Sequence, residues 1–246
     1  MIKKFSLKFK IPLLEGIIKS RPNRFIMMVE YDGKLHKCHC PSTGRIGNIV
    51  FKDIPCLLSR GNNPDRKTEF TVEAISLDKI EKKNKSWIGI NQNKANNYVE
   101  FFIRTNQLSR MIKQGEKVVK ERKLGNSRID FAVGGDYIEV KTPLIWLPSS
   151  KNVKEQTHTK FNSFDRLIKH FSDLTSNLKN DARAILLMCY MYNAEPFKPP
   201  KINKDNIRIQ RAVRKAVNKG LENWQINLKI DSHRVELLDY FELKMF

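Results

Sequence analysis

Residues 127–141 read SRIDFAVGGDYIEVK, two β-prone runs on either side of Gly134-Gly135. A Gly-Gly pair between such runs is typical of a two-residue β-hairpin turn. If Val133 pairs with Asp136 across this turn, the register of the whole hairpin follows by counting back along both strands. The stretch therefore predicts which side chains oppose one another.

In this register Asp130 lies directly opposite Glu139, and opposed residues share a face with Cβ atoms about 4.5–5.5 Å apart. Lys141 projects from the same face because it lies two residues beyond Glu139. Two carboxylates this close repel each other unless a proton or a cation lies between them. A hard divalent cation such as Mg²⁺ binds through carboxylate oxygens. The Lys141 ammonium group can orient a water molecule or stabilise charge on a phosphate.

Two alternatives stay open for this hairpin. A three-residue loop would place Asp130 and Glu139 on opposite faces, whereas a four-residue loop over residues 133–136 keeps them paired. An edge hairpin with a solvated polar face is the simpler interpretation of an Asp-Glu-Lys face taken without its context.

The charge of the chain points to a polyanionic partner. Its 46 basic and 26 acidic residues give a formal net charge of +20, of which +9 falls in residues 1–85 and +11 after them. The excess is therefore no detachable tail. Nucleic acid is the usual partner of such a protein, and a lysine-rich proteome is the alternative explanation. The apolar fraction of 40% is enough for packed cores.

No apolar stretch approaches the ~20 residues that span a bilayer. The longest apolar run, AILLMCYMY at 184–192, has the length of a buried strand. The basic N-terminal region lacks the apolar stretch and cleavage site of a signal peptide. Four cysteines without secretory context indicate reduced thiols. We expect a cytoplasmic protein without membrane partners. Its oligomeric state is left open, with a homodimer as one alternative.

Residues 1–85 read as the short strands and turns of a small β-domain, with strands expected at 25–31, 35–40, 55–59 and 69–77. The charged connector 79–86 marks the boundary of a second domain, 86–246. There we expect strands at 87–91, 127–141, from 184 and at 225–230, and helices at about 95–113, 163–178 and 205–220. Strands that alternate with helices predict an α/β domain.

Several stretches resemble the sugar fermentation stimulation protein A family, in that family's order and over about residues 20–230. The loop HCPSTG at 39–44 resembles the family's HCPNTG. The segments SRPNRF at 20–25, NPDRK at 63–67 and IGIN at 88–91 resemble its basic entry, NPKRK and VGVNT segments. SRIDF at 127–131 and YIEVK at 137–141 match its SRIDF and YVEVK pair. Arg166, Lys169 and His170 fit its RGxKHL helix.

The resemblance implies an N-terminal OB-like β-barrel, a PD-(D/E)xK nuclease-like α/β domain and DNA binding. It also implies a nuclease site at Asp130, Glu139 and Lys141. There Mg²⁺ or Mn²⁺ would be held by the two carboxylates and a backbone carbonyl near Val140.

A fourth acidic ligand often comes from the preceding helix in such nucleases. The family's helix glutamate falls on Phe101 here, with Glu100 one place early, and Glu121 before the hairpin is another candidate. Two loop residues also depart from the family: Ser42 replaces an Asn and Arg45 replaces the usual Ser.

Basic side chains of both domains are candidate nucleic-acid contacts: Arg21, Arg24, Arg45, Arg60, Arg66, Lys67, Arg128, Arg166 and Lys169. An OB-type groove binds single strands through backbone contacts and stacking aromatic residues. His170 is a candidate for positioning water or transferring a proton. A solvated basic face is the alternative for the helix at 163–178.

His36, Cys38 and Cys40 alternate, so on a strand they would share a face and could form half of a zinc site. Zinc sites, however, use paired CxxC-type spacings. Cys56 and Cys189 supply no second pair, and we therefore expect buried thiols.

The sequence thus predicts a nucleic-acid-binding protein that hydrolyses phosphodiester bonds with Mg²⁺ or Mn²⁺, with DNA favoured over RNA. The alternative is a non-catalytic DNA-binding regulator of sugar-metabolism genes. Paired carboxylates argue against it, because without a metal they would repel DNA. A third class is an RNA-processing or repair accessory that acts only with a partner.

Overall fold

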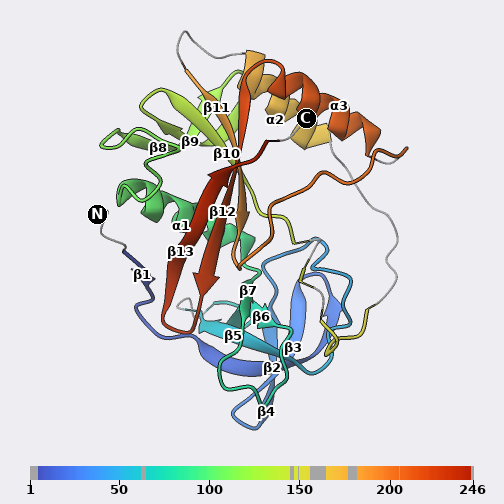
Figure 1. Ribbon diagram of the computed structural model, residues 1–246. Helices are drawn as coiled ribbons and strands as arrows, with labels where there is room; N and C mark the ends of the chain where they lie inside the picture. The colour runs from blue at the N-terminus through green and yellow to red at the C-terminus, as the bar shows by residue number, and fades with distance from the viewer. Residues whose placement is uncertain are drawn as a thin grey trace.

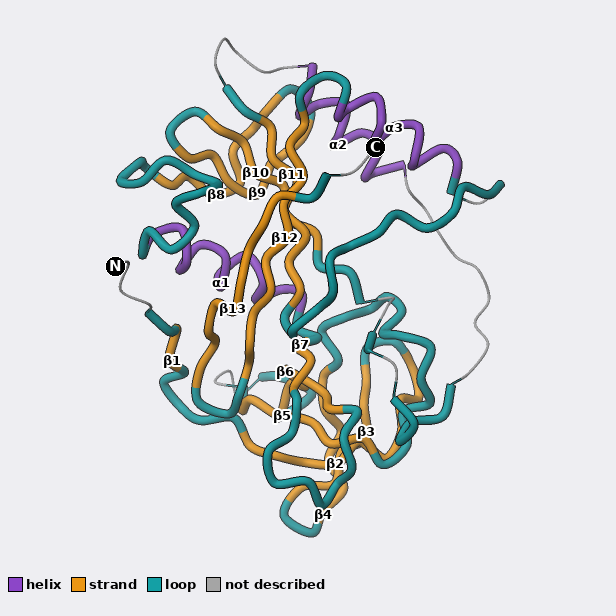
Figure 2. The backbone as a smooth tube through the Cα atoms, viewed as in Figure 1, coloured by secondary structure: helices purple, strands orange, loops and turns teal. Residues whose placement is uncertain are grey.

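Two sheets make up the fold, one in each half of the molecule (Figure 1). The computed structural model describes residues 5–61, 65–144, 147–148, 150–155, 165–176, 182–204 and 206–244. Both termini lie in the half that holds the three helices, or beside it, while the lower half consists of strands and loops (Figure 2).

The lower half is a β-barrel of the OB type. Its strands are β2 (Leu14–Asn23), β3 (Ile26–Tyr31), β4 (Lys34–His39), β5 (Ile54–Arg60), β6 (Phe70–Ser76) and β7 (Trp87–Gly89). Their order is β4-β3-β2-β5-β6-β7, and a contact between β4 and β6 at His39 and Thr71 closes five of them into a barrel. The predicted barrel is confirmed.

The upper half is built on a mixed seven-stranded sheet in the order β1-β13-β12-β11-β10-β9-β8. These strands are β1 (Leu7–Lys8), β8 (Val118–Leu124), β9 (Ser127–Val133), β10 (Asp136–Lys141), β11 (Ala184–Tyr190), β12 (Leu221–Ile230) and β13 (Arg234–Glu242). The pairs β10–β11 and β11–β12 are parallel and the others antiparallel. All seven side chains of β11 are buried, as expected of a central parallel strand covered on both faces. The predicted α/β domain is confirmed.

Helices cover both faces of this sheet. On one face α1 (Gln92–Arg104) packs through Val99 and Phe102 against Phe131 and Ile138. On the other face lie α2 (Asp165–Ser176) and α3 (Ile207–Val217), which pack around Leu186 (Figure 1). Among the described residues, no helix has both the length and the apolar character to cross a membrane.

The barrel and the sheet pack closely where β7 meets the ends of β11 and β12. The Gly89 N–H donates to the Met191 carbonyl over 2.9 Å. A Cβ atom on Gly89 would lie 2.5 Å from both Met191 Cβ and Ile230 Cδ1. Only glycine allows this approach.

Two predicted elements need correction. The helix expected at 95–113 begins at Gln92 and ends at Arg104, because Asn106 adopts a left-handed φ of +57° and the chain turns there. The strand expected at 225–230 begins at Leu221 and is not the last, since β13 follows it and forms the sheet with β1 and β12.

Candidate metal centre

The hairpin β9–β10 has the predicted register, with Val133 paired to Asp136 and Phe131 to Ile138. Asp130 and Glu139 follow this last pair of the ladder. There the Val140 N–H donates to Asp130 Oδ2 over 2.7 Å instead of to the backbone. The two-residue turn is therefore confirmed, and Asp130 and Glu139 are close enough for the charge of Glu139 to act on Asp130.

The Asp130 carboxylate is fixed at both oxygens. Asn96, on helix α1, donates its amide N–H to Asp130 Oδ1 over 2.8 Å, while Val140 holds Oδ2. Burial raises the pKa of Asp130, and the negative charge of Glu139 raises it further, against these two hydrogen bonds and the positive charge of Lys141. A cation beside the Asp130 carboxylate would offset both the cost of its burial and its repulsion by Glu139.

Glu139 is 2% exposed and its Oε1 contacts the ammonium group of Lys141, whose side chain is 33% exposed. Glu139 pairs in parallel with Leu186, so it projects toward the α2–α3 side of the sheet. Val140 lies between Glu139 and Lys141 with its side chain buried. Its N–H is committed to Asp130.

Two carboxylates and one ammonium group fit a hard divalent cation. No group of three or more His, Cys, Asp or Glu side chains comes together among the described residues. Mg²⁺ suits this donor set, because it is usually bound by one or two carboxylates and completes its octahedron with water and substrate phosphate oxygens.

The candidates for a fourth acidic ligand are engaged elsewhere. Glu100 forms ion pairs with Lys120 at 3.0 Å and Arg104 at 2.9 Å. Glu121 is 71% exposed and its carboxylate lies 3.2 Å from Arg128. The helix therefore presents the amide of Asn96 to Asp130 instead of a carboxylate.

The basic helix α2 is described only in part. Lys169 is exposed on it, whereas the side chains of Arg166 and His170 lie outside the described residues. On β9, Arg128 is exposed and two residues before Asp130.

In the barrel, four of the predicted nucleic-acid contacts interact with neighbouring groups. Arg60 pairs with Glu69 at 3.0 Å, Arg66 donates to Thr71 Oγ1 over 2.7 Å, and Arg24 lies over the exposed ring of Phe25. Arg21 holds the loop that follows β4. Lys67 and the partly exposed Arg45 form no hydrogen bond or ion pair with any residue the structure describes.

Comparison with known proteins places these features in a family. Residues 20–90 match the model of the "SfsA N-terminal OB domain", and residues 93–234 match that of the "Sugar fermentation stimulation protein RE domain". A sugar fermentation stimulation protein homolog of Synechococcus sp. (strain JA-2-3B'a(2-13)) is 30% identical over 87% of this chain and 86% of its own. The chain belongs to the sugar fermentation stimulation protein family.

Other relatives of this family match over almost their full length. The homolog of Clostridium perfringens (strain 13 / Type A) is 26% identical over 96% of this chain and 99% of its own. The structure of Pyrococcus furiosus SfsA in complex with Ca²⁺ superposes with a TM-score of 0.73 over 99% of both chains at 18% identity. The fold of this family member is therefore that of SfsA.

A loop of the barrel contacts the residues that follow β10. The Ser42 hydroxyl hydrogen-bonds Gln92 Oε1 at 3.2 Å, and Gln92 Nε2 donates to the carbonyl of Thr142 over 2.6 Å. The Gly47 N–H donates to the carbonyl of Leu144 over 2.6 Å. The residues that follow Lys141 are thereby fastened to the barrel.

Arg21 holds this loop in turn. Its Nη2 donates to the carbonyls of Arg24, Ser42 and Gly44 at 3.2, 2.8 and 3.2 Å. In the sequence, Arg45 lies between Ser42 and Gly47, the two fastened points of the loop. Sequence reasoning missed Asn96, Gln92 and the role of Ser42, although the resemblance had singled out the 39–44 loop.

The four cysteines are buried and free. Burial raises the pKa of Cys38 to about 12, with a further contribution from the charge of Glu69. Buried, protonated thiols neither attack substrates nor bind zinc readily. The prediction of buried thiols is confirmed.

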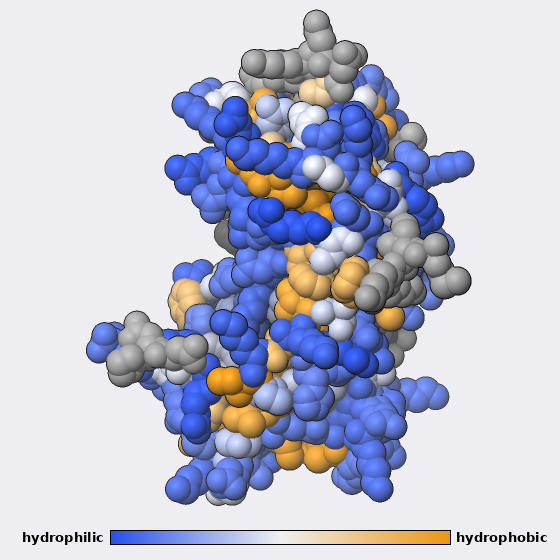
Figure 3. All heavy atoms as spheres, turned by 90° about the vertical axis from the view of Figure 1, so that its left-hand side faces the viewer, coloured by the Kyte–Doolittle hydropathy of each residue, from blue (hydrophilic) through white to orange (hydrophobic). Residues whose placement is uncertain are grey.

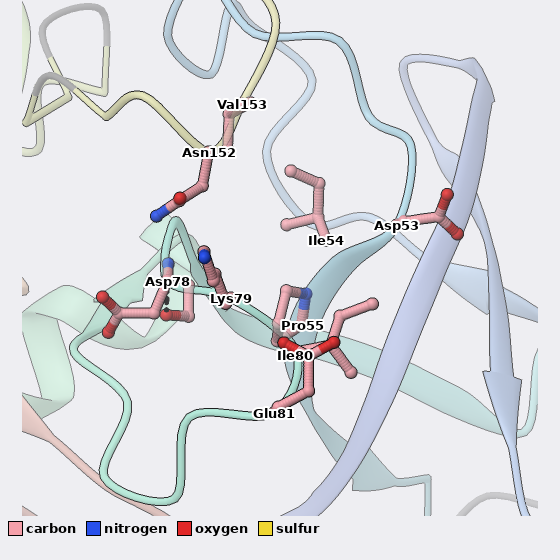
Figure 4. A pocket seen from close by; sticks show the side chains of 10 residues that line it. Asp53, Ile54, Pro55, Asp78, Lys79, Ile80, Glu81, Asn152 and Val153 are labelled. Carbon is pink, nitrogen blue, oxygen red and sulfur yellow. Dashed lines mark hydrogen bonds between the residues drawn. The ribbon is translucent and has the colours of Figure 1, made fainter.

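A groove of about 420 Å³ lies on the barrel, between the start of β5 and the turn after β6 (Figure 4). It is lined by the carboxylates of Asp53, Asp78 and Glu81, with Asn152 and Val153 across it. Asp53 pairs with Lys19 at 2.6 Å and Asp78 with Lys82 at 2.9 Å. With Lys79 also in its lining, the groove has no excess of positive charge that would favour a nucleic-acid strand.

Proposed function

We propose that this protein is a divalent-metal-dependent nuclease. The observation that carries the proposal is the pair Asp130 and Glu139 on one hairpin. Asn96 and Val140 hold the carboxylate of Asp130, and Lys141 contacts the buried Glu139. The related P. furiosus protein is described as a complex with Ca²⁺, which supports a hard cation in this family. A net charge of +20 supports a polyanionic substrate.

Asp130 and Glu139, with the backbone carbonyl of Val140, would hold Mg²⁺ or Mn²⁺. When bound, the metal polarises a phosphoryl oxygen and lowers the pKa of a coordinated water. Lys141 extends from its contact with Glu139 into solvent, where its ammonium group can orient the attacking water or stabilise charge on the phosphate. Asn96 keeps Asp130 in one orientation throughout.

The barrel would present the nucleic acid to this site. Arg45 and Lys67 are basic side chains without partners among the described residues, and contacts to phosphates position a strand without reading its sequence. The face seen in Figure 3 is largely hydrophilic, with smaller hydrophobic areas near the middle of the molecule. We expect DNA in preference to RNA, and a cytoplasmic protein, in agreement with its four free cysteines.

The test is cleavage of labelled single-stranded, duplex and branched DNA and RNA in Mg²⁺, Mn²⁺ or EDTA. Asp130→Asn and Lys141→Met preserve side-chain size and remove the proposed chemistry. Asp32→Asn, in an exposed turn, and Lys123→Met, on exposed β8, are the matched controls. We expect metal-dependent cleavage that survives in the controls and is lost in both site variants.

Tight, salt-sensitive binding without cleavage under any condition would favour the non-catalytic DNA-binding regulator. Cleavage that appears only when cell extract is added would favour a partner-dependent accessory. Cleavage that continues in Asp130→Asn at the wild-type rate would refute the site.

A further inference from the structure

The segment from residue 197 to residue 220 is the most basic part of the upper half. It contains eight basic residues and one acidic residue, Asp205. All eight basic side chains are exposed: Lys198, Lys201, Lys204, Arg208, Arg211, Arg214, Lys215 and Lys219. Arg211 and Lys215 form neither a hydrogen bond nor an ion pair with any residue the structure describes.

Folding of α3 does not require these charges. Its inner face packs Ile209, Val213 and the buried Ala216 against the core shared with α2. On the outer face, like charges three and four residues apart destabilise a helix by about 0.2–0.5 kcal/mol per pair. A polyanionic partner would offset this repulsion.

The composition of the helix argues against a general lysine bias. Three of the eleven residues of α3 are arginines, whereas the whole chain has 15 arginines among 246 residues. The guanidinium group differs from the ammonium group in its planar, bidentate fit to phosphate. The enrichment is therefore in the side chain best suited to a phosphate ester.

The helix lies on the side of the sheet toward which Glu139 projects. Glu139 pairs with Leu186, and Leu186 packs in the core with Phe171 of α2 and Ala216 of α3. The connection that precedes α3 runs out beside this layer and turns back into the helix (Figure 1). A strand held at the candidate metal centre would thus have this basic surface on the same side of the sheet.

We propose that the 197–220 surface binds the phosphate backbone of duplex nucleic acid that flanks the segment held at the metal centre. From Arg208 to Lys215 helix α3 rises about 10 Å at ~1.5 Å per residue. That length matches about three phosphates of one strand at ~3.4 Å each. The nucleic-acid identity of the partner rests on the proposed function, but the surface itself does not.

An anionic membrane is the other polyanion that such a helix can meet. A membrane-bound amphipathic helix buries its apolar face in the lipid. The apolar face of α3 is already buried against the protein core, so the geometry favours nucleic acid.

The experiment is fluorescence anisotropy of a labelled DNA duplex with the full-length protein, in EDTA, over a series of salt concentrations. The variant Arg211→Gln/Lys215→Gln removes two charges from the surface. The control Lys113→Gln/Lys117→Gln removes two exposed charges from the loop between α1 and β8. Circular dichroism verifies that both variants are folded, and vesicles that contain an anionic phospholipid form a parallel arm.

We expect the α3 variant to reduce the slope of log K against log salt by about 1.8, since each lost phosphate contact accounts for ~0.9. Affinity should fall at least about tenfold at 100 mM salt, while the control stays at the wild-type value. An α3 variant that behaves like the control, a wild-type protein that binds no duplex, or a loss confined to the vesicles would each overturn the proposal.

The two proposals fail separately. Duplex binding that depends on α3, in a protein that cleaves nothing with any metal, would retain this surface and remove the nuclease. Metal-dependent cleavage together with wild-type DNA binding by the α3 variant would retain the nuclease and remove this surface.

Discussion

The carboxylate of Asp130 accepts one hydrogen bond at each oxygen, from Asn96 on α1 and from the backbone of Val140. Each oxygen keeps a second lone pair for a cation. Asn96 is therefore a positioning residue, since it fixes the direction in which those lone pairs point.

Removal of this amide should weaken the site without unfolding the protein. We expect Asn96→Ala to lower metal affinity or cleavage by about 10–100-fold, as is typical when a partner of a metal ligand is lost. The control is Asn93→Ala, an exposed asparagine on the same helix. Metal titration followed by cleavage kinetics makes the measurement. Equal behaviour of the two variants would show that Asn96 has no positioning role.

Asp130 should also leave a signature in the pH dependence of stability. Its pKa is raised in the folded protein, first by burial and then by the charge of Glu139. The folded state therefore holds the proton more tightly than the unfolded chain, whose aspartate titrates near ~3.9. Stability must decline as pH rises from that value through the folded pKa, and then level off.

The variant Asp130→Asn keeps an acceptor for Val140 and cannot ionise. In EDTA we expect it to be more stable than wild type at pH 8, with an advantage that shrinks toward pH 4. Urea unfolding at several pH values measures the difference. Mn²⁺ should then stabilise the wild type more than the variant. A variant less stable than wild type at pH 8 would contradict the assignment of the raised pKa.

Site residues that are close together in the sequence could be predicted, whereas the one that is distant in the sequence could not. Asp130, Glu139 and Lys141 lie on one hairpin, so the turn type alone brings them together. Asn96 is 34 residues before Asp130 and comes from a helix. No local pattern marks it, because only the packing of α1 on the sheet brings the two side chains into contact.

At the scale of elements, sequence reasoning missed β2 in the barrel. The strands that it missed in the second sheet lie at or near the edges of that sheet. The edge strand β8 reads VVKERKL and exposes four consecutive charged residues. Edge strands commonly carry such charges, which prevent pairing with other chains. Strand β13, RVELLDYFE, is covered on its outer side only by the two residues of β1. In contrast, β11 is apolar throughout and was evident, because parallel central strands are buried on both faces.

The β9–β10 turn depends on glycine at Gly135, where φ is +105°. An added Cβ meets nothing within 4 Å, so only the backbone opposes substitution. We expect Gly135→Ala to lower the free energy of unfolding by about 1–3 kcal/mol, and to reduce cleavage because the turn sets Asp130 opposite Glu139. Gly44→Ala, equally open and without a positive φ, is the control. Urea unfolding of both variants measures the difference. Equal stabilities would contradict backbone strain at position 135.

At the scale of the whole molecule, a buried glutamate links the barrel to helix α1. Glu73, on β6, is 3% exposed. Its Oε1 contacts the Ser59 hydroxyl and Lys94 Nζ, the latter at 2.7 Å, and its Oε2 accepts the Asn91 amide N–H over 2.8 Å. Asn91 is the N-cap residue of α1 and Lys94 lies in its first turn, five and two residues before Asn96. The barrel thus holds the helix that holds Asp130.

Loss of this carboxylate should therefore affect both stability and the metal centre. We expect Glu73→Ala to reduce the free energy of unfolding by about 3 kcal/mol, because a buried charge-assisted network loses its acceptor. Glu69→Ala breaks an exposed pair with Arg60 and should change stability by about 0–1 kcal/mol. Urea unfolding compares the two variants. Similar decreases in the free energy of unfolding would show that the buried network around Glu73 stabilises the fold no more than an exposed ion pair does.

The effect of Glu73 on the metal centre is separated by a double-mutant cycle with Asn96→Ala. If Glu73 acts through the position of α1, Glu73→Gln should lower metal affinity in the wild-type background and have little further effect once Asn96 is alanine. In this case Glu73 would act on the metal centre only through the contact of Asn96 with Asp130. The losses of metal affinity in Glu73→Gln and Asn96→Ala would then not add in the double variant. Fully additive losses would mean that the barrel supports the site by another route, such as the loop fastened to Thr142 and Leu144.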